Sequence, residues 1–507
     1  MRKALASVLV TAVLMVVPGG TAIAAGSFTF FGSGWGHGLG MSQWGAYGLA
    51  LDGWSPARIL THFYSRTRVA TFDNAPSRLR IGLAQRNQKY RLSASGGAVD
   101  LRVGDPKDGN IAATIPDGET WTIRPESSRY QIFDGSGARV GGPVGGPSTP
   151  LYLSYEPNGA RVHIAQAGHT YNRGWIELGI DDCANACTMH LVLSIAPQDY
   201  LYGLAEVPSS WPAPALAAQA IAARTYAFHR VQTSGQHRDV CDCALYASSL
   251  DQVYAGWDKE GAVDGDRWVA AVNATDGKVL EFKGSLIQAF YSSSSGGYTE
   301  NNENVWGGTP IPYLRGVCDP GDYTSANPNA VWQVSFSTTQ VTRKLGLGIG
   351  PVQRFTDVVR GVSGRIVTVV VMGEGGSATI TGDQLRAALA LNDDRVWINA
   401  NRQVTGMIRQ KYDAIDCRPG LPTSRIAGVA GGRRQQFQRA TIFYRSDVGA
   451  HSLTSSVLDA YLSKGGPAGK LGFPTTDVRT LANGSRRARF EHGTITCDGT
   501  NCAVAAS

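Results

Sequence analysis

The sequence predicts an α+β fold: a β-rich platform with a few helices, followed by a small C-terminal module rich in turns. Residues 78–195 carry the first observation, because short apolar or alternating segments there are separated by Gly, Asp, Asn and Pro, a pattern typical of strands. Residues 199–230 carry the second. Prolines stiffen the start of an alanine-rich segment with Leu, Gln and Arg, residues that favour a helix up to about Arg230.

The first 25 residues have the composition of a secretory signal. Arg2 and Lys3 precede an apolar run over residues 4–17, and small residues follow up to Ala24 and Ala25. The run is short for a membrane-spanning helix, so we predict a cleaved signal peptide over 1–25, with a retained signal anchor as the alternative. The mature chain is expected to be secreted and to have no stable membrane span.

Cysteine count and charge set further limits. The eight cysteines fit an oxidising compartment. Two pairs lie close enough to bond locally, Cys183 with Cys187 and Cys497 with Cys502, whereas the pairing of the remaining four stays open: Cys241, Cys243, Cys318 and Cys417. The net charge of +7 suits a protein that works near an anionic polymer, and we expect no nucleic-acid partner.

The stretch 199–230, DYLYGLAEVPSSWPAPALAAQAIAARTYAFHR, contains one glutamate in apolar surroundings. Leu204 and Val207 flank Glu206, and Trp211 follows. Burial disfavours the charged form of a carboxyl group, so we expect the pKa of Glu206 to be raised. A group of this kind stays protonated near neutral pH and can donate a proton in catalysis.

Two other segments are candidates for ligand contacts. The glycine-rich block 32–66 has His37, Ser42 and Gln43 among small residues, and closely spaced glycines let the backbone approach a ligand. The segment 292–297, SSSSGG, offers hydroxyl groups and backbone amides to a polar ligand. The alternative interpretations are a tight structural turn for the first segment and a solvated turn for the second.

The rest of the chain is predicted from periodicity and composition. The patterns favour helices over 264–275 and 381–391 and a strand over 365–373. Residues 421–436 contain Pro, Gly, Ser and Arg without clear periodicity, which predicts a linker. Residues 437–507 then form the small module, and a disulfide between Cys497 and Cys502 would staple it.

Several separate motifs between residues 26 and 420 resemble the stage II sporulation protein D family, also called the SpoIID/LytB or amidase-enhancer family. They are YLYGLAEVPSSWPAPALAAQAIAARTYA (200–227), QVYAG (252–256), AFYSSSSGGYTEN (289–301), VWGGTPIPYLRGVCDP (305–320) and ITGDQLRAALAL (380–391). YNRGWIEL (171–178) and GWGHGLGMSQWGAYGLA (34–50) resemble two further blocks of the family. In the module, KGGPAGKLGFPTTD (464–477) resembles an LGFP repeat, which is associated with cell-wall proteins.

The sequence departs from the family pattern in two respects. The glycine-histidine block closes the domain in the family, whereas here it comes first, at 32–66, which predicts a permuted domain whose N-terminal block packs back onto the same site. Some family members resemble zinc proteins, with ligands just before the QVY motif. His237, Cys241 and Cys243 are zinc candidates, but a clear fourth ligand is missing and an exported protein favours disulfides, so we predict no cofactor.

The resemblance implies a lytic transglycosylase with a glycan-binding cleft. Such an enzyme cleaves the bond from N-acetylmuramic acid to N-acetylglucosamine in peptidoglycan strands stripped of stem peptides, and leaves a 1,6-anhydro end. The resemblance assigns the catalytic acid to Glu206. One carboxyl group is sufficient, because the nucleophile is the 6-hydroxyl group of the sugar itself, whereas a glycosidase of the usual type needs two placed carboxylates.

Substrate contacts are expected from three segments around Glu206. The helix would contribute Arg224 and Tyr226, the serine-glycine loop would contribute Ser293, Ser294 and Thr299, and the N-terminal block would contribute His37, Ser42 and Gln43. The alternative role for Arg224 is a buried ion pair that holds the helix.

Two other functions stay open. In the first, Glu300 or Glu303 assists Glu206 in a two-carboxylate glycan hydrolase. In the second, the protein is a non-catalytic wall-binding amidase enhancer that presents glycan to another enzyme. The expected partners are peptidoglycan glycan strands and a peptidoglycan amidase, and the expected location is secreted and cell-wall associated. Sporulation, growth and division are all compatible processes.

Overall fold

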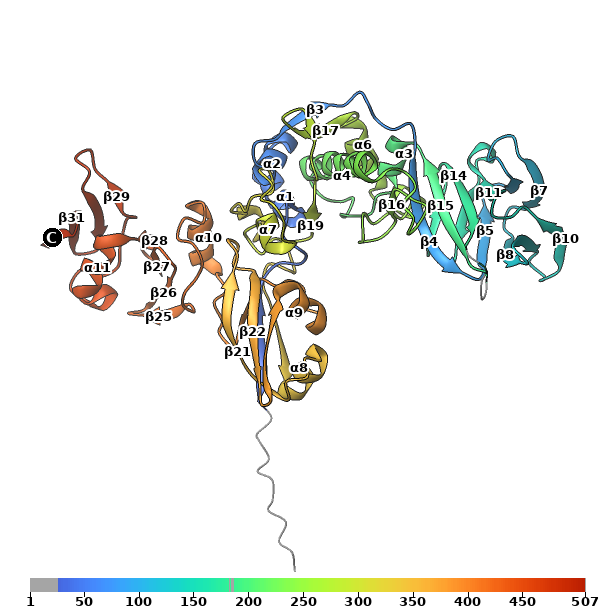
Figure 1. Ribbon diagram of the computed structural model, residues 1–507. Coiled ribbons are helices and arrows are strands. Elements are labelled where there is room, and N and C mark those ends of the chain that lie inside the picture. Colours follow the sequence, from blue (N-terminus) through green and yellow to red (C-terminus); the bar gives the residue numbers. More distant parts are fainter. Residues whose placement is uncertain (1–25, 182, 184–186, 507) are drawn as a thin grey trace, which may run out of the picture.

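The computed structural model describes residues 26–181, 183 and 187–506. The predicted signal peptide over 1–25 lies outside these described residues. The α+β prediction is confirmed, because helices and several separate sheets both occur along the chain. In Figure 1 the β-rich platform lies at one end, a central helical region follows, a lobe extends below that region, and the C-terminal module lies at the other end.

The β-rich platform consists of two sheets that share one hydrophobic core. Its elements are β4 (Leu79–Asn87), β5 (Tyr90–Ser95), β6 (Val99–Val103), β7 (Asn110–Ile115), β8 (Thr120–Glu126), β9 (Arg129–Phe133), β10 (Arg139–Val144), β11 (Leu151–Ser154), the 3₁₀ turn η1 (Glu156–Asn158), β12 (Arg161–Ile164), β13 (His169–Tyr171), β14 (Trp175–Ile180), β15 (Met189–Ile195) and β16 (Leu245–Tyr246). The sheet orders are β16-β4-β15-β14-β11-β6-β7 and β10-β9-β8-β5-β12-β13. Alternate residues point inward, so Leu92 and Ile123 of one sheet and Leu153 and Leu193 of the other are fully buried.

Each platform segment that the sequence pattern marks as a strand forms one, whereas β6, β7, β10, β13 and β16 are further strands that were not predicted. β10 is an example, because its sequence RVGGPV contains two glycines and a proline. It lies at the edge of its sheet, where a residue without a backbone N–H is tolerated. Pairing with the neighbouring strand, rather than local propensity, therefore forms this element.

The central region is built around α4 (Ala213–Ser234), the helix predicted after the proline-rich entry. Every residue from Ala215 to Thr225 is buried, as expected for an apolar helix with neighbours on all sides. The other elements here are β2 (Met41–Ser42), α1 (Gln43–Leu51), α2 (Pro56–Phe63), β3 (Arg68–Thr71), α3 (Pro197–Tyr202), α5 (Trp257–Glu260), α6 (Gly265–Ala274), β17 (Lys278–Phe282), β18 (Ser285–Leu286), β19 (Tyr291–Ser292), α7 (Asn302–Val305) and the 3₁₀ turn η2 (Pro320–Asp322). The helix predicted over 264–275 is α6.

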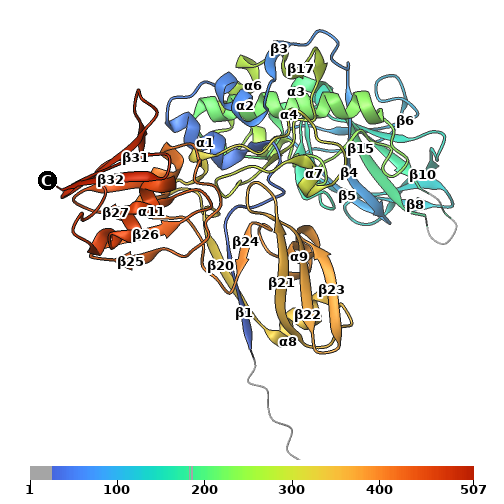
Figure 2. The ribbon, with the colours of Figure 1, turned by 60° about the vertical axis from the view of Figure 1, so that its left-hand side comes forward.

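The lobe joins the first described strand to residues far along the chain. Its elements are β1 (Ser27–Gly32), β20 (Trp332–Ser337), α8 (Thr338–Leu345), β21 (Val352–Arg360), β22 (Ile366–Gly373), β23 (Gly376–Thr381), α9 (Gly382–Leu389) and β24 (Val396–Ile398). β1 lies between β20 and β24, where Phe30 pairs with both Val334 and Ile398. Figure 2 shows β1 rising through the lobe toward the central region. A permuted domain requires such a return of the N-terminal segment to later parts of the chain.

The C-terminal module contains two four-stranded sheets, and α10 (Gly406–Ala414) leads into it. Its elements are β25 (Ala427–Val429), β26 (Gly432–Gln436), β27 (Thr441–Arg445), β28 (Gly449–Leu453), α11 (Ser455–Ser463), the 3₁₀ turn η3 (Gly466–Ala468), β29 (Arg479–Thr480), β30 (Arg486–Phe490), β31 (Gly493–Asp498) and β32 (Asn501–Ala506). Within each sheet the strands follow chain order.

The structure differs from the predicted linker over 421–436, because β25 and β26 fall within it and join the first sheet of the module. The apolar alternation that marks a strand is missing there. The buried side chain of β26 is Gln435, whose Nε2 donates to the backbone oxygens of Ser424 and Gln403 at 3.1 and 3.3 Å. On this inner face, hydrogen bonds therefore stabilise β26 in place of apolar contacts. For this reason the composition of the segment does not predict the strand.

All eight cysteines, each among the described residues, are paired. The two predicted local pairs form disulfides, and the four cysteines whose pairing stayed open form Cys241–Cys243 and Cys318–Cys417. Cys497 and Cys502 lie opposite each other on β31 and β32. The Cys318–Cys417 bond ties the segment after the serine-glycine loop to the residues that follow α10, and so joins the central region to the start of the module.

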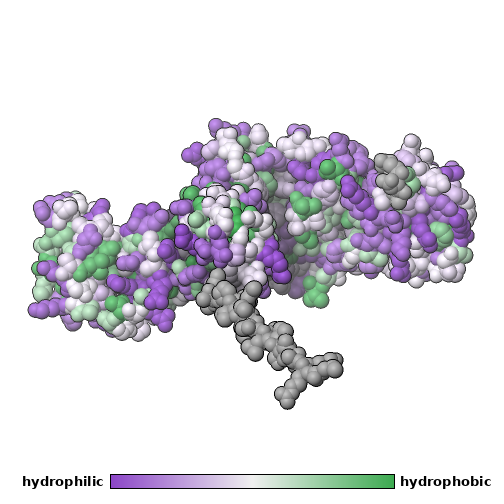
Figure 3. Space-filling model, turned by 60° about the horizontal axis from the view of Figure 1, so that its bottom comes forward, coloured by the Kyte–Doolittle hydropathy of each residue, from purple (hydrophilic) through white to green (hydrophobic). Residues whose placement is uncertain are grey.

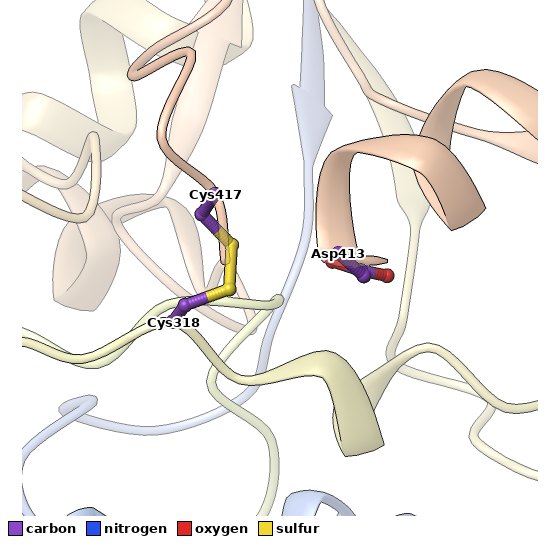
Figure 4. A group of neighbouring side chains, drawn as sticks. All are labelled: Cys318, Asp413 and Cys417. Carbon is purple, nitrogen blue, oxygen red and sulfur yellow. A yellow bond between two sulfur atoms is a disulfide. The ribbon is translucent and has the colours of Figure 1, made fainter. Parts of the chain in front are cut away.

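Figure 4 shows Asp413 beside the Cys318–Cys417 disulfide, the one group among the described residues in which three side chains of metal-binding type lie close together. A disulfide sulfur is not a thiolate, which is the form that binds metals. Asp413 also accepts two hydrogen bonds from Nε of Arg409, at 2.7 and 2.8 Å. The group therefore lacks the free donors that a metal ion would need.

The face drawn in Figure 3 is mainly hydrophilic, with small, separate apolar patches and a recess near its middle. Among the described residues, no helix combines the length and the apolar composition that crossing a membrane would take.

The Cys318–Cys417 disulfide should stabilise the protein more than the Cys183–Cys187 disulfide. The first joins cysteines 99 positions apart and the second joins cysteines 4 positions apart. Because a longer cross-linked loop removes more entropy from the unfolded chain, replacing Cys318 and Cys417 with serine should cost roughly 3 kcal/mol more unfolding free energy than replacing Cys183 and Cys187. Denaturant unfolding followed by near-UV circular dichroism measures both losses, and equal losses would contradict the expectation.

Candidate active site

A cavity of about 510 Å³ lies where the central region meets the lobe. Segments far apart in the sequence form its wall and contribute, among others, Trp35, Gln43, Glu206, Tyr291, Trp306 and Arg386. Concave sites assembled from several segments are the usual location of ligand binding in proteins. The cavity is therefore the candidate active site.

Glu206 is held in this cavity by the segment 252–256. The backbone amide of Val253 donates to Oε1 of Glu206 at 2.7 Å, and Nε2 of Gln43 approaches Oε2 at 3.5 Å. The amide of Ala205 donates to the carbonyl oxygen of Val253 at 2.8 Å, so the two segments run side by side. Burial raises the pKa of Glu206, and hydrogen bonds from Val253, Tyr291 and Gln43 offset only part of this effect.

A chain of buried hydrogen bonds orients the groups next to Glu206. Tyr200 donates to Oε1 of Gln252 at 3.1 Å, and Nε2 of Gln252 donates to the hydroxyl oxygen of Tyr291 at 2.8 Å. Gln252 has no exposed surface. The hydroxyl group of Tyr291, which accepts from Gln252, is thereby directed to donate to the carboxylate of Glu206.

The N-terminal block packs against the serine-glycine loop. β2 pairs in parallel with β19, so Met41 lies beside Tyr291 and Ser42 beside Ser292. Gly36 has a φ of 128°, and a Cβ atom at this position would lie 2.6 Å from the Cβ of Ser292. Any side chain there would collide with the loop, so this glycine makes the close approach possible.

His37 lines the cavity as a neutral ring. Burial, together with the positive charges of Arg365 and Arg386, lowers its pKa to about 3. The amide of Leu39 donates to Nδ1 of His37 at 3.0 Å, so this nitrogen is the acceptor of the neutral ring. The ring packs near Trp306, with the centroids 5.0 Å apart.

Gln43, Tyr226 and Ser293, also predicted as substrate contacts, line the cavity. Tyr226 donates to Oδ1 of Asp251 at 2.9 Å. Asp251 lines the cavity too, but its carboxylate is engaged from inside by Nη2 of Arg238 at 2.8 Å and by Nε of Arg230 at 3.4 Å. Asp251 is therefore a fixed negative charge that positions Tyr226.

Arg224, by contrast, lies outside the cavity. The structure therefore differs from the prediction that Arg224 contacts the substrate. Its buried guanidinium group donates to the backbone oxygens of Thr275 and Lys278 at 2.7 and 3.0 Å, and so ties α4 to the turn after α6. The structure also differs from the alternative role of Arg224 in a buried ion pair. The hydrogen-bond acceptors of Arg224 among the described residues are carbonyl groups and Gln198, rather than carboxylates. Burial lowers its pKa to about 10.

Three hydroxyl residues predicted to contact substrate are likewise turned away from the cavity. Ser42 and Ser294 donate to Oδ1 of the buried Asp322, each at 2.9 Å, and Ser42 also caps the start of α1. Thr299 accepts a backbone hydrogen bond at 2.9 Å. These hydroxyl groups therefore bind neighbouring groups of the protein and hold the loop. The sequence does not distinguish this role from ligand binding.

The carboxylates considered as helpers of Glu206 lie elsewhere. Glu300 is fully buried and accepts hydrogen bonds from the amides of Val362 and Ser363 at 3.1 and 3.0 Å. Glu303 pairs with Arg315. Neither side chain forms part of the cavity wall.

The zinc candidates do not form a set of free ligands. Cys241 and Cys243 are bonded to each other, and Nδ1 of His237 contacts the carboxylate of Asp242. Since zinc binds thiolates and not disulfides, these residues as they stand do not fit a zinc ion.

Sequence reasoning missed Trp35, Asp251, Tyr291, Trp306 and Arg386 as cavity residues. Each lies inside or directly beside a block that resembles the family; Tyr291 is in AFYSSSSGG and Arg386 is in TGDQLR. Proximity to these blocks was the available signal. Residue type alone was uninformative, because aromatic residues and arginines of this chain also occur in its core.

Replacing Glu206 with Gln should stabilise the protein in a pH-dependent way. The pKa of Glu206 is raised in the folded state, so its contribution to stability is complete below the unfolded-state pKa and is lost as pH rises through the folded-state pKa. The variant should therefore unfold at a higher temperature than the wild type at about pH 8 and at nearly the same temperature at about pH 4. Calorimetry at both values tests this.

The matched control is Glu374→Gln, which changes an exposed carboxylate in the lobe. This control should show no comparable gain at either pH. A gain for Glu206→Gln that is equal at both values, or larger in acid, would contradict the expectation.

Comparison with known proteins adds family relationships to this geometry. Residues 186–282 match the family model described as Stage II sporulation protein (SpoIID), and residues 420–469 match the LGFP repeat. The match over 186–282 includes Glu206 and the segment 252–256 that holds it.

Named relatives agree with these matches. An amidase enhancer of Bacillus subtilis (strain 168) is 38% identical over 139 residues, which are 27% of this chain and 17% of that protein. The stage II sporulation protein D of Bacillus amyloliquefaciens is 29% identical over 212 residues, 40% of this chain and 60% of that protein, and its counterpart in Bacillus subtilis (strain 168) is 29% identical over 213 residues. The chain thus spans less than two thirds of each relative. It carries a domain of the Stage II sporulation protein (SpoIID) family at residues 186–282 and an LGFP repeat at residues 420–469.

Proposed function

We propose that the protein is a lytic transglycosylase that cleaves the glycan strands of peptidoglycan with Glu206 as its single acid and base. The observation that carries this proposal is a carboxyl group with a raised pKa in a cavity where the other carboxylate, Asp251, is already engaged by arginines. Relatives named stage II sporulation protein D and amidase enhancer support a function in the cell wall.

The chemistry follows from one carboxyl group. Protonated Glu206 donates its proton to the glycosidic oxygen as the bond between that oxygen and C1 of N-acetylmuramic acid breaks. The 6-hydroxyl oxygen of the same sugar then bonds to C1, and its proton passes to the Glu206 carboxylate. The proton is thus returned and no water is consumed. An intramolecular nucleophile has a high effective concentration, which lowers the entropic part of the barrier.

A two-carboxylate hydrolase is less well supported by the contacts. The partner carboxylate of a glycosidase must be free to act as a nucleophile or to activate water. Oδ1 of Asp251 accepts from Tyr226, and Oδ2 accepts from Arg238 and from the amide of Tyr246 at 2.9 Å. Glu300 is occupied by backbone amides. These groups serve the structure of the protein, which favours Glu206 acting alone.

The mouth of the cavity suits a sugar polymer. Trp35 and Trp306 are 50% and 56% exposed although both are large aromatic residues. Exposed aromatic faces in a cavity are surfaces against which the C–H faces of sugar rings pack, and amide and hydroxyl groups nearby supply directed hydrogen bonds. Gln43, Tyr226 and Ser293 are the groups in this position.

Product analysis tests the proposal directly. Wild-type protein acting on purified glycan strands without stem peptides should release fragments with 1,6-anhydro ends, which mass spectrometry distinguishes from reducing ends. Glu206→Gln should lower the rate by about 10² to 10⁴-fold, the usual contribution of a general acid or base. Glu303→Gln is the matched control and should keep wild-type activity. Reducing ends in place of anhydro ends would refute the transglycosylase.

The amidase-enhancer alternative predicts a different outcome. If the protein only presents glycan to another enzyme, the wild type leaves purified strands uncleaved but binds them, and Glu206→Gln changes neither result. The name of the Bacillus subtilis relative is the observation that favours this second candidate.

We further propose that the LGFP-containing module anchors a secreted protein to the cell wall. The module forms its own hydrophobic core around Phe443, Tyr461 and Phe490, separate from the core of the platform and central region. Removing residues 426–507 should therefore reduce the fraction of protein that pellets with purified sacculi several-fold. Cleavage of soluble glycan at an unchanged rate is the control for folding of the remaining chain. Undiminished pelleting would count against the anchor.

A further inference from the structure

Arg386 brings a positive charge from the lobe to the cavity that contains Glu206. It lies on α9, which starts with a capping box formed by Thr381 and Gln384, so the helix has a defined beginning. Among the described residues that line the cavity, Arg386 is the only lysine or arginine. His37 adds no second cation, because its pKa is lowered to about 3.

The guanidinium group of Arg386 has no hydrogen-bond or ion-pair partner among the described residues, although the chain has many carboxylates. Burial and the charge of Asp393 raise the pKa of the nearby Asp394, and the field of Arg386 offsets only a small part of this rise. The ion pair of Asp394 is made with Nε of Arg365 at 3.5 Å. Most other arginines that reach an inner surface of this protein are engaged, as Arg224, Arg365 and Arg395 are. A half-buried, unpaired arginine in a cavity implies an anionic ligand group.

The lobe holds Arg386 in a fixed relation to Glu206. Arg365 donates to the carbonyl oxygens of Ser295 and Tyr298, both at 3.0 Å, and to Asp393 at 2.8 Å. Arg395 donates to the carbonyl oxygen of Gly296 at 2.9 Å. These two buried arginines fasten the lobe to the serine-glycine loop. Since the same loop forms the wall beside Glu206, the positive charge is part of a preorganised site.

We propose that Arg386 is a specificity-determining residue that binds the free lactyl carboxylate of an N-acetylmuramic acid unit in the glycan strand. This inference rests on the proposed glycan substrate. The carboxylate is the one negative group that such a strand carries at every second sugar. A planar guanidinium group matches it with two parallel hydrogen bonds.

The assignment explains how the cavity distinguishes two forms of the same strand. In peptide-bearing peptidoglycan the lactyl carboxyl is joined to the stem peptide as a neutral amide, which offers no charge to Arg386 and carries bulk into the cavity. Hydrolysis of that amide bond releases the carboxylate.

The test uses the full chain and two glycans that differ only at the lactyl group. One is glycan without stem peptides, and the other is the same glycan with its lactyl carboxylates converted to primary amides by carbodiimide and ammonia. Wild-type protein should show a kcat/KM roughly 10- to 100-fold lower on the amidated glycan, the range expected for a charge-assisted hydrogen bond. Arg386→Gln should lose the same factor on the charged glycan and change by less than about two-fold on the amidated one.

Variants keep the outcome interpretable. Arg386→Lys retains the charge without the planar fork and should recover part of the preference. Arg343→Gln, which removes an exposed arginine of α8 in the same lobe, should keep the full wild-type preference. The comparison of the two glycans with wild-type protein needs no variant, so misfolding of Arg386→Gln leaves that test intact.

Binding separates this inference from the proposed function. Glu206→Gln protein should bind the charged glycan roughly 10- to 100-fold more tightly than the amidated glycan, and the double variant Glu206→Gln with Arg386→Gln should bind both alike. If the wild type proves inert but this charge preference holds, the transglycosylase fails and the role of Arg386 stands. Equal binding of the two glycans by Glu206→Gln, or binding of neither, overturns the role of Arg386.

Discussion

One hydrogen bond inside a buried cavity supports the candidate site: the amide of Val253 donates to Oε1 of Glu206. Burial and this bond act in opposite directions on the carboxyl group. Burial favours the protonated form, whereas a hydrogen bond from an amide favours the carboxylate. The net effect is a raised pKa with a fixed orientation. A carboxyl group that is both oriented and easily protonated is what proton transfer to a leaving oxygen requires.

Buried polar contacts, more than the hydrophobic core, arrange the groups around this carboxyl. Arg365 and Arg395 fasten the lobe to the serine-glycine loop, and Asp322 gathers hydroxyls from both the loop and the N-terminal block. A buried polar group without a partner is costly, so such a network permits few alternative arrangements. This explains how a cavity built from distant segments keeps one geometry.

Of the site residues predicted from the sequence, some line the cavity and others do not. Glu206, His37, Gln43, Tyr226 and Ser293 all line the cavity. Ser42, Ser294, Thr299 and Arg224 belong to the same motifs but bind other parts of the protein. A hydroxyl group that holds a loop and one that holds a sugar have the same local sequence signal, because both need a small polar residue near glycine. Which role applies depends on the direction of the side chain.

By itself the sequence determined the local features: most platform strands, the apolar helix α4, the close cysteine pairs and the isolated Glu206. These depend on alternation, propensity and short spacing, which act over a few residues. Only the tertiary structure decided that β1 pairs with β20 and β24, that 421–436 contains β25 and β26, and that Arg386 faces the same cavity as Glu206. These features arise from contacts between segments far apart in the chain, and local residue preferences carry no information about such contacts.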